Sequence, residues 1–156
     1  ASPPSRPRSS YRADDAARGP PEVGGPMTAL PPQAKEWIDG LGFAVLATLD
    51  AEGAPQQVVM WVARDGDDVL ISTVEGRIAH RNLSRDPRAC VVVQPPGNPY
   101  QYVEIRGTAS MTSEGGDDFI SALSAKYRGV TPYPLIGPDE PRVVIRLTPD
   151  KVVLRA

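Results

Sequence analysis

Residues 43–73 read FAVLATLDAEGAPQQVVMWVARDGDDVLIST, and this stretch indicates the fold class of the chain. Apolar residues recur with a period of two from Phe43 to Asp50, which is typical of a β-strand. The turn-forming segments DAEGAP and RDGDD then separate two further strands, predicted over 57–63 and 69–73. Consecutive strands joined by such short turns form a β-meander, so we expect an antiparallel sheet.

Strand and helix patterns alternate through the rest of the chain. Residues 75–85 contain helix formers and end shortly before Pro87, which predicts a short helix. Further strands are predicted over 89–94, 100–112 and 142–155. In the last of these, Val143, Ile145 and Leu147 are expected to face one side of the sheet.

An acid-rich segment after Ser113 predicts a second helix. Ser113 is a favourable N-cap residue, and acidic side chains in the first turn complement the helix dipole. Phe119, Leu123 and Tyr127 recur at helical spacing and predict the buried face. With about six strands and two or three short helices, the chain is expected to be mainly β and to form a small antiparallel β-barrel.

Composition and charge narrow the class of protein. A chain of 156 residues, 40% of them hydrophobic, is expected to form one domain with a real core. The formal net charge of -2 provides no general attraction for nucleic acid or an anionic membrane. The single cysteine, Cys90, lies in an apolar strand and is expected to be a small buried side chain. Without a long apolar span or a secretory signal, the protein is predicted to be soluble and cytoplasmic.

Residues 1–27 differ from the remainder in composition. They are rich in Pro and Arg and poor in aliphatic side chains, so they cannot bury enough apolar surface to offset the entropy of ordering. We expect a disordered tail or an added leader, with Met27 as a candidate native start. A native arm that orders against a partner subunit is the alternative. Residues 28–156 are expected to form the folded domain.

A basic segment lies between two of the predicted strands. It contains four Arg and the only His of the chain: Arg77, His80, Arg81, Arg85 and Arg88. On a helix, the first three Arg would share one face. The simplest interpretation is a solvated helix flank, with Ile78 and Leu83 turned toward the core.

The same segment also permits two functional interpretations. The free N–H groups at the start of the helix, with Arg77 and the hydroxyls of Ser72 and Thr73, would form a phosphate site. A nucleic-acid surface is disfavoured, because aromatic residues are not interleaved with the basic ones.

The order of these motifs resembles that of the pyridoxamine 5'-phosphate oxidase-like family. A strand ending IST is followed by GR, a helix containing RNL, then RDPR and an apolar strand, and NPYQYVEIRGTA precedes the acid-rich helix. The similarity extends from about Leu30 to Val153 and points to the actinobacterial branch that uses the deazaflavin coenzyme F420. The resemblance implies an FMN-binding split β-barrel that works as a homodimer, with two cofactor sites between the subunits.

The resemblance also implies which residues lie along the flavin-like ring. The strand QQVVMW matches the family strand beside the ring, which places Gln56, Val59, Met60 and Trp61 near it. The alternative is that Trp61 and Val59 are simply core residues.

Further positions match the phosphate site and the subunit interface of the family. Ser72, Thr73 and Arg77 match positions around the cofactor phosphate. Tyr100 and Tyr102 match aromatic positions that the second subunit contributes to the site, although both could merely pack at the dimer seam.

One feature departs from the family pattern. Members commonly have a Lys one or two places after the matched Arg, but this chain has Ile78 and Ala79 there. Losing one charge-assisted contact weakens binding by about ten- to a hundredfold. His80 or Arg81 could substitute, or the cofactor could differ.

The resemblance implies an oxidoreductase that transfers a hydride between reduced F420 and a small conjugated or quinone-like substrate. The alternatives are an FMN-dependent oxidoreductase of the same fold and a non-catalytic flavin- or deazaflavin-binding carrier protein. No catalytic residue is predicted, because the sequence contains no nucleophile elbow, zinc-ligand set, P-loop or dinucleotide fingerprint. The proton donor remains open between Tyr102, Tyr133 and water.

Overall fold

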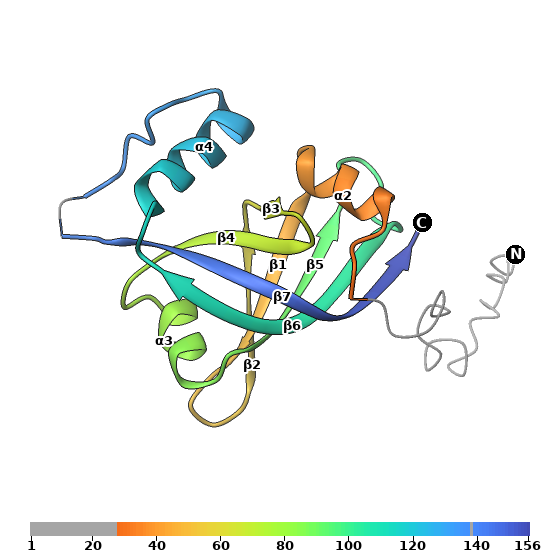
Figure 1. Cartoon of the computed structure of the whole chain (residues 1–156), viewed down its shortest axis with the longest axis horizontal. Helices are drawn as coiled ribbons and strands as arrows, with labels where there is room; N and C mark the ends of the chain where they lie inside the picture. Colours follow the sequence, from red (N-terminus) through yellow and green to blue (C-terminus); the bar gives the residue numbers. More distant parts are fainter. Residues whose placement is uncertain (1–27, 138) are drawn as a thin grey trace, which may run out of the picture.

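A computed structural model describes residues 28–137 and 139–156 (Figure 1). The predictions for residues 1–27 lie outside this range. The strands are β1 (Phe43–Leu49), β2 (Pro55–Met60), β3 (Ala63–Asp65), β4 (Asp68–Val74), β5 (Arg88–Gln94), β6 (Tyr102–Thr112) and β7 (Arg142–Arg155). The helices are α2 (Pro32–Asp39), α3 (Ile78–Arg85) and α4 (Gly116–Arg128).

The described strands form one antiparallel sheet in the order β2-β1-β5-β6-β7-β4-β3. Strands β2 and β3 are therefore opposite edges, which would lie about 29 Å apart in a flat sheet. In the chain, however, only Trp61 and Val62 separate them, and a link of that length spans about 10 Å. The sheet must curl until its two edges approach each other.

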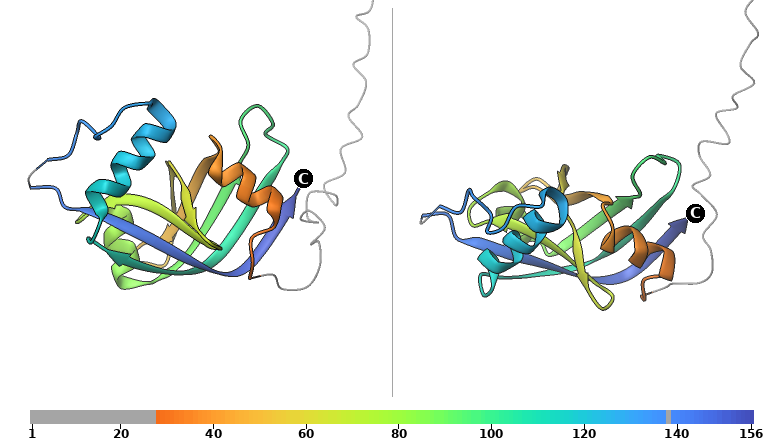
Figure 2. Two further views of the ribbon diagram at one scale, coloured as in Figure 1. Left: turned by 45° about the horizontal axis from the view of Figure 1, so that its top comes forward. Right: turned by 90° about the horizontal axis from the view of Figure 1, so that it is seen from above.

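The helices are consistent with this curvature. Helix α3 contacts both β1 and β4, and α2 contacts both β3 and β5, although these strands are not neighbours in the sheet. The views in Figures 1 and 2 agree that α4 lies at one end of the molecule and the end of β7 at the other. The core fills the space inside the curl, and its largest fully buried aliphatic side chains include Ile38, Leu46, Ile71, Ile105, Ile145 and Leu147.

The prediction of a mainly β, antiparallel fold is confirmed, and the strands have the split-barrel arrangement. The sheet is not a closed barrel, because β2 and β3 are not hydrogen-bonded neighbours among the described strands. The alternation in β7 is as predicted, with Val143, Ile145 and Leu147 all buried. No helix in the described part of the chain is long and apolar enough to cross a membrane.

Two of the predicted strands had wrong boundaries. The strand expected over 57–63 is β2, which begins at Pro55 and ends at Met60; Ala63 already belongs to β3. The apolar run continues past Met60 because Val62 is fully buried where the chain crosses between the sheet edges. The strand expected over 100–112 begins only at Tyr102.

The helices differ more from the sequence prediction. Helix α2 was not predicted, although Pro32 stands at its first turn and Ala34, Trp37 and Ile38 are buried at helical spacing. Helix α3 begins at Ile78 instead of residue 75, because Gly76 has φ of 82° and interrupts any earlier helix.

The predicted N-cap of α4 was also wrong. Gly115, in the left-handed conformation, precedes the helix, and no side chain caps it. The acidic first turn is present as Asp117 and Asp118. On the predicted face, Leu123 is buried, whereas Phe119 and Tyr127 are half-buried.

Candidate functional site

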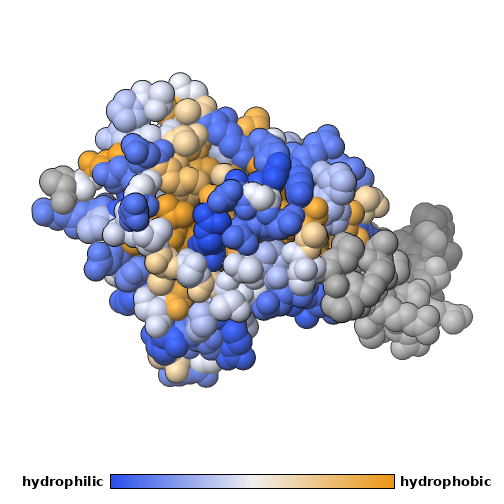
Figure 3. Space-filling view, viewed as in Figure 1, coloured by the Kyte–Doolittle hydropathy of each residue, from blue (hydrophilic) through white to orange (hydrophobic). Residues whose placement is uncertain are grey.

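A cavity of about 560 Å³ opens beside helices α3 and α4. Its lining comes from β1, β2, β4, β7, α3, α4 and the segments next to them: Phe43, Thr48, Gln56, Val58, Val59, Met60, Trp61, Ser72, Thr73, Arg77, Ile78, Ala79, Arg81, Ile120, Leu123, Tyr133 and Arg142. This volume lies in the range of small-molecule and cofactor sites. In Figure 3, hydrophobic surface gathers between α4 above and α3 below, beside hydrophilic residues.

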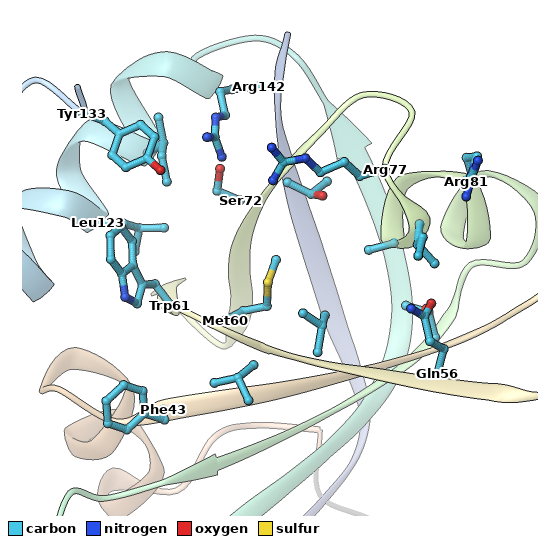
Figure 4. A pocket seen from close by; sticks show the side chains of 17 residues that line it. Phe43, Gln56, Met60, Trp61, Ser72, Arg77, Arg81, Leu123, Tyr133 and Arg142 are labelled. Carbon is cyan, nitrogen blue, oxygen red and sulfur yellow. The ribbon is translucent and has the colours of Figure 1, made fainter. Parts of the chain in front are cut away.

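One end of the cavity is cationic. Arg77 and Arg142 extend from different directions toward the Ser72 side chain (Figure 4). Ser72 is only 8% exposed, and its Oγ has no hydrogen-bond partner. Buried hydroxyl groups are normally hydrogen-bonded, so this end of the cavity presents an unused donor beside two positive charges.

Arg142 is the more deeply buried of the two cations, with 8% of its surface exposed. It is the first residue of β7 and pairs with Val74 of β4, two residues beyond Ser72. Its guanidinium carbon lies 4.9 Å from the ring centroid of Tyr133, a cation–π contact. Within residues 28–137 and 139–156, no carboxylate forms an ion pair with it.

Arg77 occupies the junction between β4 and α3. It is the N-cap residue of α3, and its side chain is largely exposed. Its Nη2 lies 3.9 Å from Oε2 of Glu140, so this ion pair is long and solvated. Such a pair contributes little to stability, which leaves Arg77 available to an anion in the cavity.

The wall that extends from the cationic end is apolar and aromatic. The Trp61 ring lies parallel to the Tyr127 ring, with centroids 5.4 Å apart and an angle of 5° between the planes. The Tyr133 ring meets the same indole edge-on, with centroids 6.3 Å apart. Met60 and Phe43 continue this wall in Figure 4. A flat conjugated ring system would find an apolar surface here.

A polar network holds Gln56 at another part of the cavity wall. The buried Asn82 donates from Nδ2 to Oγ1 of Thr48 and to Oε1 of Gln56, both at 3.0 Å. Because the Gln56 oxygen is occupied as an acceptor, the amide N–H groups of Gln56 remain for the cavity.

The structure brings most of the predicted site residues together. Gln56, Val59, Met60, Trp61, Ser72, Thr73 and Arg77 all line this cavity. Tyr100 and Tyr102 do not line it; Tyr100 is 81% exposed in the loop before β6.

The solvated-flank interpretation of the basic segment is correct only in part. Arg81 and Arg85 are exposed on α3, but Arg77 precedes the helix. Leu83 is buried as predicted, whereas Ile78 is 47% exposed and lines the cavity.

The suggested substitutes for the missing lysine have different positions. Arg81 lines the cavity. His80 does not; its Nδ1 accepts a hydrogen bond of 3.1 Å from the backbone N–H of Gly76. Of the two tyrosines named as proton donors, Tyr133 lines this cavity and Tyr102 does not.

Arg142 lines the cavity but was not among the site residues predicted from the sequence. It stands next to a run of alternating buried residues, so its position inside the sheet could have been noticed. The proximity of Arg142 to Ser72 could not be predicted from the sequence, because 69 residues separate them and only the pairing of β4 with β7 brings them together.

Residues 30–156 match the family described as Pyridoxamine 5'-phosphate oxidase. Among solved structures, the chain is similar to an F420 reductase, with 28% sequence identity and a TM-score of 0.68, over 79% of this chain and 98% of that chain.

Two further solved structures show the fold alone. General Stress Protein 26 from Bacillus anthracis is 19% identical, with a TM-score of 0.60, over 78% of this chain and 90% of that chain. A heme binding protein from Mycobacterium smegmatis is 23% identical, with a TM-score of 0.59, over 81% of this chain and 55% of that chain. Because the family match includes nearly all described residues, this chain belongs to the pyridoxamine 5'-phosphate oxidase family.

Proposed function

We propose that this protein is an oxidoreductase that uses the deazaflavin coenzyme F420. In this proposal a hydride passes between the reduced coenzyme and a small conjugated or quinone-like substrate. Membership of the family and the similarity to an F420 reductase support it. We propose in addition that the chain belongs to the F420-dependent actinobacterial branch of the family.

One observation carries the proposal: the cavity is cationic at one end and apolar along its wall. The buried, unpartnered Ser72 hydroxyl and the Arg77 guanidinium fit a phosphate group. Met60 and Trp61 offer an apolar wall to a flat ring. A phosphorylated cofactor with a conjugated ring has both of these parts, so the residues present fit such a group.

The proposed tasks of the chain are to bind, to orient and to exclude water. When bound, F420 supplies two-electron hydride chemistry at its deazaflavin ring. Ser72, Thr73 and Arg77 would hold the phosphate. Trp61, whose ring stacks on that of Tyr127, would offer an apolar surface to the ring of the coenzyme. The amide N–H groups of Gln56, whose oxygen already accepts a hydrogen bond from Asn82, would be available as donors to the coenzyme.

We also propose that two copies of the chain form the working unit. The cavity is open, and Val59 (65% exposed) and Phe43 present apolar side chains at it. A second copy would cover these side chains and supply Tyr100 and Tyr102. Light scattering after gel filtration should therefore give the mass of a dimer, and a monomer that binds F420 tightly would contradict this arrangement.

FMN is the second candidate cofactor. Ile78 and Ala79 line the cavity at the places where similar proteins commonly have a Lys, so the phosphate site differs from the usual one. An FMN-dependent oxidoreductase of the same fold would use the same apolar wall and the same anion site.

Titration of the purified protein with F420 and with FMN tests the function. We expect F420 to bind with a dissociation constant in the micromolar range or below, and quenching of its fluorescence measures this binding. Arg77→Ala should weaken this binding about tenfold or more, whereas the matched charge change Arg85→Ala, outside the cavity, should not. Tighter binding of FMN would transfer the proposal to that cofactor, and no binding of either would end it.

A kinetic experiment separates an enzyme from a carrier. Reduced F420 bound to the protein is mixed in a stopped-flow instrument with enones, quinones and tetrapyrroles. At least one substrate should accelerate oxidation of the bound coenzyme above its rate in free solution. Tight binding without acceleration by any of them would favour the non-catalytic carrier.

A further inference from the structure

We propose that Tyr127 is a positioning residue for the cavity: it fixes the rings of Trp61 and Phe43, although it does not itself line the cavity. The inference deepens the proposed function and rests on it, because the apolar wall that these two rings form is where the ring of the coenzyme would lie. The spectroscopic part of its test, however, needs no coenzyme.

The first argument is the contact of the Tyr127 ring with both aromatic residues. The ring lies parallel to the Trp61 indole, with 5.4 Å between the centroids. It also meets the Phe43 ring at an angle of 35°, with 6.4 Å between the centroids. Aromatic pairs at such separations attract each other beyond the effect of burial. One side chain of α4 therefore packs against two residues of the cavity wall.

The second argument is independent and concerns the Tyr127 hydroxyl. It donates a hydrogen bond of 2.6 Å to the backbone oxygen of Gly42 and accepts one of 3.3 Å from the backbone N–H of Val62. Gly42 immediately precedes Phe43, and Val62 immediately follows Trp61. The hydroxyl thus holds the main chain beside each ring, at the start of β1 and in the link between β2 and β3.

Trp61 and Phe43 need such support, because the core does not enclose them. Phe43 is 53% exposed and Trp61 is half-buried. In the described part of the chain, the indole N–H of Trp61 donates no hydrogen bond to a protein group. Tyr133 meets the indole edge-on, so the contact with the face of the indole comes from Tyr127. The orientation of the indole therefore depends on this stacked pair.

Helix α4 holds Tyr127 in place before any ligand binds. Leu123, one turn earlier on the same face of the helix, is 2% exposed and lines the cavity. Lys126 donates hydrogen bonds to the backbone oxygens of Ile38 and Val62. Burial raises the pKa of Tyr127, so its hydroxyl keeps the proton that it donates. The helix thus lines the cavity with one residue and supports its wall with the next one along that face.

The test reads the orientation of Trp61 directly. A near-UV circular dichroism spectrum is recorded for the full chain, for each variant and for the Trp61→Phe version of each. The difference within each pair is the Trp61 signal. A ring held in one orientation gives such a signal, whereas a ring without fixed packing loses it. The dissociation constants of F420 and FMN are measured on the same proteins by fluorescence titration.

Three variants make the inference specific. Tyr127→Leu removes the stacked ring and the hydroxyl, so it should lose most of the Trp61 signal and bind the cofactor about three- to tenfold more weakly. Tyr127→Phe keeps the ring, so its signal and affinity should rank between those of Tyr127→Leu and the wild type. Val152→Ala shortens a buried core side chain that does not line the cavity, so it should lower the urea midpoint but keep the wild-type signal and affinity.

The outcomes separate this inference from the proposed function. An unchanged Trp61 signal in Tyr127→Leu overturns the inference, as does an unchanged dissociation constant of a cofactor that binds the wild type. Loss of the signal in folded Val152→Ala also overturns it, because the signal would then follow stability. If Tyr127→Leu does not fold, Tyr127→Phe decides by the same criteria. If the signal depends on Tyr127 but neither F420 nor FMN binds the wild type, the positioning of Trp61 stands and the proposed function fails.

Discussion

The ammonium group of Lys126 donates a hydrogen bond to the backbone oxygen of Val62, with 2.7 Å between Nζ and O. Val62 lies between β2 and β3, where the chain crosses from one edge of the sheet to the other. The backbone N–H of Val62 is also satisfied by α4, since it donates to the Tyr127 hydroxyl at 3.3 Å. Side chains of α4 therefore satisfy backbone groups at the place where the sheet is split.

Lys126→Met should lower the free energy of unfolding by about 1–2 kcal/mol, because the oxygens of Val62 and Ile38 lose their donor. Desolvation lowers the pKa of Lys126 below 10.5, so the folded state binds this proton less tightly than the unfolded state. The free energy of unfolding of the wild type should therefore increase as the pH rises through this lowered pKa toward 10.5. Urea unfolding of the wild type and of Lys126→Met over this pH range tests this prediction. The difference between their free energies of unfolding should grow with pH, and a constant difference would refute the role assigned to the charge.

Asn82→Ala should lower the free energy of unfolding by about 2–3 kcal/mol, because it removes one buried and one partly buried hydrogen bond and leaves polar groups of Thr48 and Gln56 without this donor. Thr48→Val removes only one of these bonds and should cost less. Chemical denaturation of the two variants measures the difference. Equal stability of Asn82→Ala and wild type would show that the network contributes nothing.

Gly116→Ala should destabilise the protein by about 1–3 kcal/mol, because the added Cβ would overlap the backbone of Arg142 and push α4 away from β7. The control is Gly115→Ala, where the methyl meets no atom within 4 Å and only the φ of 71° opposes it. Thermal unfolding of both variants and of the wild type measures the effect. A melting temperature of Gly116→Ala equal to that of the wild type would contradict the close packing of α4 against β7.

Cys90 should react slowly with thiol reagents at neutral pH. It is half-buried in β5, and desolvation raises the pKa of its thiol from 9.0 to about 11, with the charge of Glu104 acting in the same direction. Because the folded state holds the proton more tightly, the stability due to this group should fall as the pH rises from 9.0 to about 11. The rate of reaction with a disulfide reagent, in native and in urea-unfolded protein, measures the protection; equal rates would rule it out.

The strands were the most predictable part of this protein. The alternation in β1 and β7 depends on neighbouring residues alone, and both strands were located from it. Helix α2 has the same kind of local signal, with Pro32 at its first turn, but it is only eight residues long and was overlooked. Packing of Trp37 and Ile38 into the core, more than helix propensity, accounts for its formation.

Chain-local patterns were thus sufficient for the antiparallel strands and the junction at Arg77, whereas the assignment of Val59, Met60 and Trp61 to the site came from the resemblance to the family. Backbone sterics and the alternation of side chains act over a few residues, so a linear pattern can express them. The cavity depends on a different kind of information. Arg142 reaches Ser72 through the pairing of β4 with β7, and Tyr127 supports Trp61 through the packing of α4 across the split sheet. These contacts join residues far apart in the chain, and the curvature of the whole sheet decides which of them meet.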